Sequence, residues 1–302
     1  MGIHQQALQL LLLAQAEGVR FDRTATLGRL FLYIDTHSML EEFASFDLRL
    51  DLTEAERIMR TEDGYADPLF RHLGAVTVES VDASPYEGCT IVLDMNHPVP
   101  SALERRFSTV IDFGTLEHIF NVPVALRNSM EMVEPDGHLL CYSPGNNFFG
   151  HGFYQFSPEF YFRTLTPENG FAVEHALVCT DEQAPRWFVL SDPSEIGRRV
   201  TLQNSIPSSL AVIARRINTS RAFASMPQES DYAAVWSRAS GLKGVLWRRG
   251  SRIARKGLPE RSREKLKGLI VGGDAHHGGP DLAEISIQSV ARQARDSARQ
   301  DA

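Results

Sequence analysis

The sequence predicts an α/β protein in which a mostly parallel β-sheet is covered by helices. Short β-branched or apolar runs alternate with segments of helical period along most of the chain, which is typical of such a sheet. At 302 residues with 43% hydrophobic content, the chain is also long enough for one large α/β domain and an appendage. The expected strands are residues 24–27, 77–81, 90–93, 109–113, 138–142, 172–179 and 210–214.

Helices are expected in the connections between these strands. Between the fourth and fifth strands, residues 122–133 carry apolar side chains at helical spacing, and a Pro-Asp-Gly turn comes next at 135–137. Residues 31–75 are long for a single connection and predict two helices. Ser157 followed by Pro158 is a favourable helix start.

The N-terminal residues 8–14 form an apolar run that ends next to small residues. A signal peptide is one interpretation of this run. No Lys or Arg precedes it, however, and nearby glutamines give it an amphipathic helical period, so we expect a packed helix. No later stretch approaches the ~18 to 20 uninterrupted apolar residues that a membrane-spanning helix needs.

Charge and cysteine usage narrow the possible functions. The formal net charge of -7 is spread over both signs, so the molecule as a whole has no nucleic-acid footprint. Cys89, Cys141 and Cys179 form no CxxC pair and fall in or beside apolar runs. They predict buried free thiols in a reducing compartment, and we therefore expect a cytoplasmic protein.

The composition of the chain changes near Asn218. We predict a main domain at residues 1–217 and a mostly helical, basic C-terminal extension at 218–302 with a frayed end. Within this extension, residues 241–270 set Trp and aliphatic side chains among Arg and Lys. A solvated helix is one interpretation of that segment, and contact with an anionic membrane surface or a partner is the other.

Polar residues lie just after the ends of the expected strands, where an open parallel sheet binds its ligands. Asp82 comes after the second strand, and Asp94 with Met95 after the third. The fourth strand carries Asp112 at its end and runs into Gly-Thr-Leu-Glu-His at 114–118. An acid at the second position can accept hydrogen bonds from both ribose hydroxyls, and one at the third can accept from an adenine amino group. Both roles suit an adenosyl cofactor.

Residues 110–119, Val-Ile-Asp-Phe-Gly-Thr-Leu-Glu-His-Ile, resemble the signature of class I S-adenosylmethionine-dependent methyltransferases of the small-molecule type. Residues 126–140 resemble the helix, Pro-x-Gly turn and fifth strand of that family, and the likeness covers about residues 20–215. It implies a Rossmann-like seven-stranded sheet with S-adenosyl-L-methionine as cofactor. It also implies that Thr115, Glu117 and His118 flank the methionine end and the methyl group. The implied cofactor-binding set is Gly28, Arg29, Asp82, Asp94, Met95, Asp112 and Thr115.

Two features depart from that family pattern. The first strand of the family runs into a Gly-x-Gly-x-Gly turn, whereas this chain has Gly28 alone, followed by Arg29. Arg29 either clamps the cofactor carboxylate with two bonds or is a surface arginine. Only eleven residues separate Asp82 from Asp94, too few for a crossover helix, so residues 84–88 predict a tight turn. Each aspartate also has the simpler interpretation of a turn cap.

Residues 144–158 combine glycines, aromatic rings, amides and an imidazole directly after a strand. This suits either a pocket for a polar acceptor or an ordered turn with aromatic packing. The candidate bases are His151 and then His118, with Glu117 orienting the imidazole. Their spacing fits no standard ligand motif, so we expect no metal. The candidate acceptor-binding residues are Asn146, Asn147, Tyr154 and Gln155.

The sequence thus predicts a methyltransferase for a small polar or sugar-type acceptor, of the kind used in surface-glycan or secondary metabolism. A non-catalytic methyltransferase-fold binding or scaffold protein is the first alternative, which the single glycine after the first strand favours. A nucleotide or nicotinamide site without methyl transfer is the second, because ribose recognition is shared among these ligands.

Overall fold

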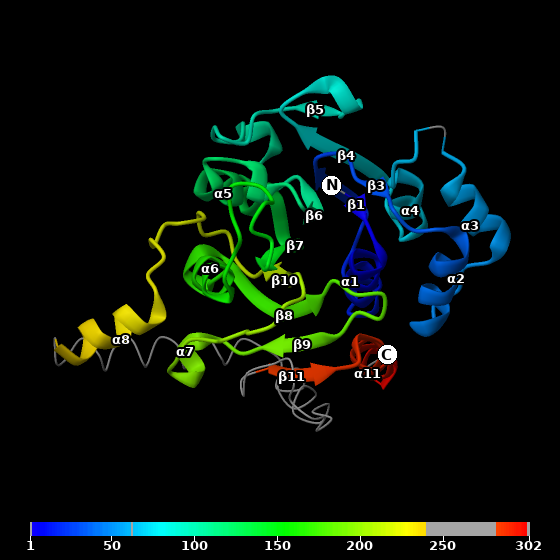
Figure 1. Cartoon of the computed structure of the whole chain (residues 1–302). Coiled ribbons are helices and arrows are strands. Elements are labelled where there is room, and N and C mark those ends of the chain that lie inside the picture. Colours follow the sequence, from blue (N-terminus) through cyan, green and yellow to red (C-terminus); the bar gives the residue numbers. More distant parts are fainter. Residues whose placement is uncertain (1, 62, 240–281, 301–302) are drawn as a thin grey trace.

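The computed structural model describes residues 2–61, 63–239 and 282–300. Its central element is a sheet in the order β11-β9-β8-β10-β7-β6-β2-β4-β5 (Figure 1). The strands are β2 (Arg23–Leu27), β4 (Thr77–Asp82), β5 (Ile91–Val92), β6 (Phe107–Phe113), β7 (Val133–Asn146), β8 (Phe171–Thr180), β9 (Trp187–Leu190), β10 (Ser208–Arg216) and β11 (Leu282–Ile285). All seven strands expected from the sequence are confirmed, but the sheet has nine strands, because β9 and β11 extend it.

The order in which the strands are added to the sheet reverses at β2, in the middle of its parallel part. β4 and β5 lie on one side of β2, and β6 and β7 lie on the other, with all neighbours parallel. β10 is antiparallel to both β7 and β8. Such a reversal opens a crevice at the carboxyl ends of the two strands that flank it, here β2 and β6, and this is where ligands bind in open α/β sheets.

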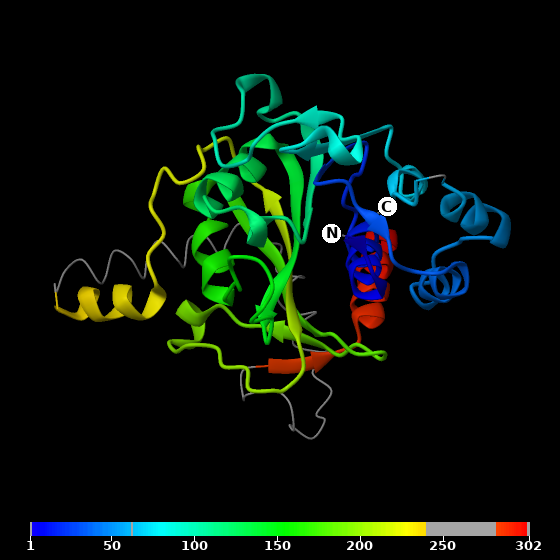
Figure 2. The same cartoon turned by 45° about the horizontal axis from the view of Figure 1, so that its top comes forward.

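Helices cover both faces of the sheet (Figure 2). Ile111 and Leu140 pack in a core with the helices of one face, whereas their neighbours Val110 and Leu139 pack in the core of the other face. This alternation results from the two-residue period of a strand. The first face carries α1 (Gln5–Ala16), α4 (Asp67–His72) and α11 (Ile287–Gln300), and the second carries α5 (Val122–Met132) and α6 (Pro158–Thr164).

The long connection between β2 and β4 holds three helices, not the two predicted. α2 (Thr36–Ser45) and α3 (Leu52–Met59) stand beyond the sheet (Figure 1), and the short α4 leads back to it. Aspartate side chains cap the first two, with Asp35 accepting from the Ser38 N–H and Asp51 from the Glu54 N–H. Pro68 is the second residue of the third helix, in the first turn, where its missing N–H costs nothing.

The smaller elements complete the described chain. A short parallel pair joins β1 (Gly2–Ile3) to β3 (Phe31–Leu32). The single-turn helices are η1 (Pro85–Glu87), η2 (Ser101–Leu103), η3 (Leu116–His118), η4 (Pro167–Asn169) and α7 (Pro193–Ile196), and α8 spans Ser230–Ala239. Among the described residues, no helix combines the length and apolar character needed to cross a membrane.

The N-terminal helix α1 is packed, as expected, but it is buried on nearly all sides instead of being amphipathic. Gln9 is buried, where it donates to Glu42 at 3.0 Å and accepts from the Trp187 indole at 2.8 Å. Gln9, one of the glutamines that suggested an exposed face, therefore belongs to a buried polar network, which satisfies groups that would otherwise be costly to bury.

Within the predicted extension at 218–302, the described residues 282–300 are neither separate from the main sheet nor frayed. β11 pairs antiparallel with β9 at the edge of the main sheet, and α11 lies beside α1 (Figure 2). Ile287, Val290, Ala291 and Ala294 are buried at the spacing i, i+3, i+4, i+7 and form one apolar stripe. The basic segment at residues 241–270 lies outside the described residues.

We expect Ile287→Ala to lower the free energy of unfolding by about 2 to 5 kcal/mol, because it removes a buried aliphatic side chain between α11 and α1. Chemical denaturation of the full chain measures this change. Asp296→Ala, on the exposed side of the same helix, is the matched control and should change little. Equal stabilities for the two variants would contradict the packing of α11.

Candidate functional site

The crevice between β2 and β6 is bordered by a glycine in a left-handed conformation. Gly28 has a φ of 69°, which favours glycine because it lacks a Cβ. Its N–H donates to the Val81 carbonyl at 2.7 Å, and the Thr115 hydroxyl donates to the Leu27 carbonyl at 2.6 Å. These bonds tie the ends of β2, β4 and β6 together, so that Gly28 and Thr115 lie at one edge of the sheet.

Asp82 and Asp94 lie at this edge, and each also closes a local turn. Asp82 is half-buried, and its Oδ1 accepts from the Ser84 N–H at 3.0 Å. Its Oδ2 has no hydrogen-bond partner within the described parts of the chain. Asp94 accepts from the backbone and the side chain of Asn96, and these bonds lower the pKa of its carboxyl group. Met95, another member of the predicted cofactor-binding set, is buried. Turn closure uses only one oxygen of Asp82 and leaves the other free to bind a ligand.

Arg29 is neither a free surface arginine nor an open clamp. Its guanidinium donates to the Glu87 carbonyl at 3.1 Å and to Asp63 at 2.7 Å, and it stacks on Tyr65 with Cζ 3.9 Å from the ring centroid. Asp67 lies 3.6 Å away. Arg29 thus links the end of β2 to η1 and to the start of α4, and a cofactor carboxylate would have to displace Asp63.

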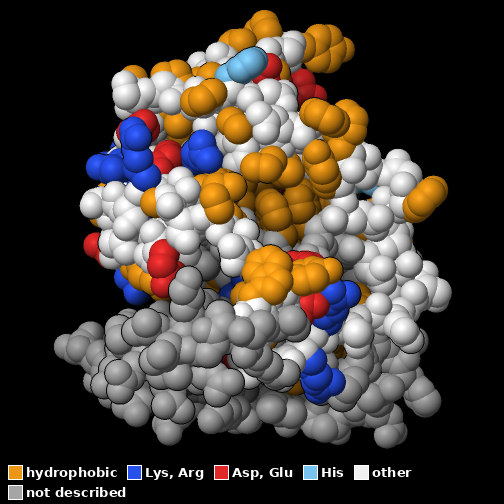
Figure 3. Space-filling view, turned by 90° about the vertical axis from the view of Figure 1, so that its left-hand side faces the viewer, with side chains coloured by type: hydrophobic (Ala, Val, Ile, Leu, Met, Phe, Trp, Pro, Cys, Tyr) orange, Lys and Arg blue, Asp and Glu red, His pale blue; other side chains and the backbone are white. Residues whose placement is uncertain are grey.

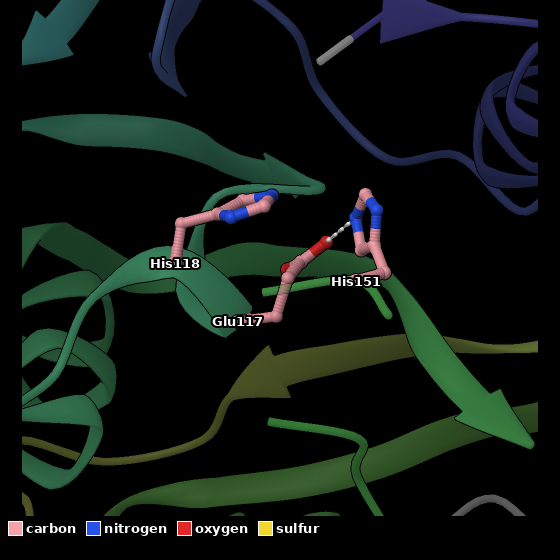
Figure 4. A group of neighbouring side chains, drawn as sticks. All are labelled: Glu117, His118 and His151. Carbon is pink, nitrogen blue, oxygen red and sulfur yellow. Dashed lines mark ion pairs between the residues drawn. The ribbon is translucent and has the colours of Figure 1, made fainter. Parts of the chain in front are cut away.

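Glu117, His118 and His151 converge beside η3 (Figure 4). His151 Nε2 lies 3.4 Å from Glu117 Oε1, and the two imidazole centroids are 4.8 Å apart in an edge-to-face arrangement. The Glu117 side chain is only 2% exposed, whereas that of His151 is 49% exposed. A buried carboxylate therefore faces two imidazoles that open toward solvent, and the structure brings the three predicted catalytic residues together.

A tight loop after β7 brings His151 to this position. The Phe153 N–H donates to the Glu117 carbonyl at 2.7 Å, which fixes the loop on η3. Between them, Gly152 has a φ of 65°, and a Cβ there would lie 2.7 Å from the Glu117 carbonyl oxygen. Because only glycine fits both the dihedral and the contact, Gly152 is required for the Glu117–His151 approach. No sequence pattern singled out this residue.

Asp112 was predicted to bind the cofactor, but its position in the structure does not fit that role. Its carboxyl group is completely buried and accepts from the N–H groups of Thr115 and Leu116 at 3.0 and 3.1 Å. It therefore holds the turn from β6 into η3 and does not reach the crevice. Burial, reinforced by the nearby charge of Glu117, raises the pKa of Asp112, and burial also raises the pKa of Glu117. Burial, followed by the charge of His151, lowers the pKa of His118.

The raised pKa of Asp112 predicts a stability that falls with pH. The folded group has a pKa of about 8, against about 4 when unfolded, so the unfolded chain ionises first as the pH rises. Within that window, each pH unit costs up to about 1.4 kcal/mol of stability. Asp112→Asn keeps the acceptor oxygen and removes the ionisation. The melting temperature of wild type should therefore fall relative to that of the variant from about pH 4 to about pH 8.

Thermal melts in buffer containing a chelator test this, because no adventitious cation can then compensate the carboxylates. Cys141 and Tyr161 line the same region, but burial raises the pKa of each well above its usual range, so both stay protonated. Parallel pH profiles for wild type and Asp112→Asn would show that the Asp112 carboxyl group titrates normally.

The amide side chains that were predicted to bind the acceptor make hydrogen bonds within and next to the loop after β7. Asn147 Nδ2 donates to the Ile206 carbonyl at 2.9 Å, and Asn146 Nδ2 to the Asn204 side chain at 3.0 Å. Gln155 accepts from the Phe148 N–H at 2.7 Å. These side chains hold the loop closed and have few groups left for an acceptor.

Aromatic rings are the exposed groups next to the Glu117 cluster. Tyr154 donates to the Phe120 carbonyl at 2.7 Å, and Phe120 and Phe153 are 72% and 65% exposed with ring centroids 5.7 Å apart. Figure 3 shows hydrophobic side chains gathered on the face of the molecule that carries α5 and α6. Isolated exposed rings are common, but a group of them beside a polar cluster marks a binding surface.

A separate hollow of about 390 Å³ lies on the outer side of α5. Pro98, Arg127, Asn128 and Phe223 are among the residues that line it, and none of the strand-end residues does. The hollow therefore does not belong to the crevice between β2 and β6.

No protein-family model matches the chain, and no curated protein matches its sequence. Solved structures do align with it at low identity. A proposed methyltransferase of Bacillus halodurans is 12% identical with a TM-score of 0.40, and the alignment covers 69% of this chain and 99% of that one. An S-adenosylmethionine-dependent methyltransferase of Mesorhizobium loti is 16% identical with a TM-score of 0.38, covering 70% and 98%.

A third structure is the N-methyltransferase NodS of Bradyrhizobium japonicum in complex with S-adenosylhomocysteine. It is 13% identical to this chain with a TM-score of 0.36, and the alignment covers 70% of this chain and 87% of that one. The class that the sheet order and helical layers of this chain define is the Rossmann-like α/β fold.

Proposed function

We propose that this protein is an S-adenosylmethionine-dependent methyltransferase acting on a small polar or sugar-type acceptor. The observation that carries this proposal is a meeting of two kinds of polar group at one edge of the sheet. Two aspartates suited to a nucleoside follow β4 and β5, and a cluster suited to an acceptor hydroxyl follows β6 and β7. These two pairs of strands lie on opposite sides of the point between β2 and β6 where the strand order reverses.

With the exception of Arg29, the residues at the crevice suit an adenosyl cofactor. Asp82 keeps one carboxylate oxygen for ribose hydroxyls, and Asp94 lies after β5, where the adenine would bind. Gly28 presents backbone without a side chain. Arg29 can bind the carboxylate of the cofactor only by exchanging Asp63 for it. When bound, the cofactor supplies an electrophilic methyl group on its sulfonium.

The acceptor side is served by the Glu117 cluster and the exposed rings. Methyl transfer is an in-line displacement, so the protein must align the acceptor oxygen and receive its proton. His151 is open to solvent and is held by the buried Glu117, which orients its imidazole. Phe120 and Phe153 offer flat apolar faces on which a sugar ring can stack.

The second candidate is a non-catalytic binding protein of the same fold. The pairing of Arg29 with Asp63 favours it, because this contact keeps the guanidinium from a cofactor carboxylate. Incubation with methyl-labelled S-adenosylmethionine and pools of sugar nucleotides and hydroxylated metabolites separates the two. Label in a small molecule supports the enzyme, whereas cofactor binding without label in any pool supports the binding protein.

A further inference from the structure

We propose that Glu117, His118 and His151 bind one divalent first-row transition-metal ion of the Zn²⁺ type. Each residue offers one ligand atom, and these atoms all lie within 4.8 Å of one another. Figure 4 shows the three side chains pointing toward a common centre. The sequence spacing gave no sign of this site, because His151 reaches it only through the loop that Gly152 and Phe153 fix on η3.

The second observation is that the buried carboxylate of the cluster has an unsatisfied oxygen. Glu117 Oε2 is buried and has no hydrogen-bond partner in the described part of the chain. Glu117 and the buried Asp112 also form no ion pair with Lys or Arg within residues 2–61, 63–239 and 282–300. Burying carboxylates without a cation or a proton is costly, and buried charges are typically paired or bound to metal. A metal ion between the imidazoles and this carboxylate would compensate the buried charge of Glu117.

The donor set selects the kind of metal. Two imidazoles and one carboxylate match catalytic Zn²⁺ sites, which keep a further position open, whereas Mg²⁺ and Ca²⁺ prefer oxygen ligands alone. Bonds of about 2.0–2.2 Å place neighbouring ligands of a tetrahedral ion roughly 3.4 Å apart. His118 and His151 can close to that spacing by side-chain rotation, because both are exposed. The open position would face solvent and the aromatic surface.

Ion binding at this cluster does not depend on methyl transfer. If the proposed methyltransferase activity holds, the ion would lie on the acceptor side, and in the loaded protein His151 would be a ligand and not a free base. Titration with the metal alone reads out this site, whereas titration with S-adenosylhomocysteine reads out the cofactor crevice. A negative result in the metal titration therefore says nothing about the cofactor crevice, and a negative result with S-adenosylhomocysteine says nothing about the metal site.

The test is a titration of the untagged full chain with Co²⁺, monitored by the visible absorption bands of the bound ion. The adjacent His276 and His277 are replaced by alanine in every protein used, so that they cannot compete. We expect one equivalent of Co²⁺ per chain. Glu117→Gln and His151→Ala should each weaken binding at least tenfold, because losing even a residue that merely supports a ligand costs about 10- to 100-fold.

His37→Ala is the matched control. His37 lies 3.2 Å from Glu41 on α2, so it is a histidine–carboxylate pair with both side chains exposed, but outside the cluster. Its removal should leave Co²⁺ affinity unchanged. Absence of Co²⁺ bands in wild type, or equal affinities for wild type and His151→Ala, would overturn the site. If Glu117→Gln fails to fold, His118→Ala and His151→Ala decide, because both positions are exposed.

Discussion

In the metal-free protein, where the His151 imidazole is a free base, His151→Ala is expected to lower methyl-transfer turnover by about 100- to 10,000-fold, the usual range for losing a group that accepts a proton in the transition state. Affinity for S-adenosylhomocysteine should stay nearly unchanged. His151 lies on the loop after β7 and contacts Glu117 and His118, whereas the residues assigned to the cofactor lie after β2, β4 and β5. Steady-state kinetics with saturating acceptor, combined with calorimetric titration, measure both quantities.

The matched control is Phe149→Ala in the same loop, where the ring is 99% exposed. It disturbs the loop surface without touching the Glu117 cluster, so its turnover should remain within a few-fold of wild type. Wild-type turnover in His151→Ala would show that His151 is not the base and serves only in packing. Equal losses in both variants would mean that loop structure, and not the imidazole, sets the rate.

Asp82→Ala should weaken the binding of S-adenosylhomocysteine at least tenfold without unfolding the protein. Hydrogen bonds to a charged acceptor contribute roughly 1.5 to 3 kcal/mol each, and about 1.4 kcal/mol is a factor of ten in affinity. Asp82 is half-buried and makes one local bond to the Ser84 N–H, so the cost in stability should be only about 1 kcal/mol. Isothermal titration and thermal melts of the unliganded proteins measure the two effects.

Asp35→Ala separates ligand binding from turn closure. Asp35 accepts from the Ser38 N–H at 2.9 Å, a local cap like that of Asp82, but it lies on α2 away from the crevice. It should lose a similar amount of stability and keep full affinity. If Asp82→Ala behaves in the same way as Asp35→Ala, the ribose assignment is wrong and Asp82 only closes its turn.

Most strands were predictable because local sequence patterns determine them. The outermost strand, β11, and the helix after it, α11, were not. β2, β4, β6, β7, β8 and β10 are apolar, β-branched runs between clear turns. β11 is four residues long and pairs with β9 across about ninety residues of chain, so no local signal identifies it. α11 is a polar sequence whose only signal is one stripe of four small or aliphatic residues.

The site divides in the same way. The positions of Asp82, Asp94 and Glu117 could be predicted from the order of the strand ends, because carboxyl ends of parallel strands meet at one edge. The partners of these side chains depend on contacts distant in sequence. Arg29 is paired by Asp63, which lies 34 residues further along the same connection between β2 and β4, and His151 meets Glu117 only because Gly152 accepts a left-handed φ.

Calorimetric titration of S-adenosylhomocysteine into the wild-type chain tests the central claim most directly, because every proposed role at the crevice requires an adenosyl cofactor. We predict saturable binding of one ligand per chain, a matching rise in melting temperature, and weaker binding in Asp82→Ala. Absence of both heat and a melting shift in a folded wild-type sample, at ligand concentrations well above those of the protein, would contradict it.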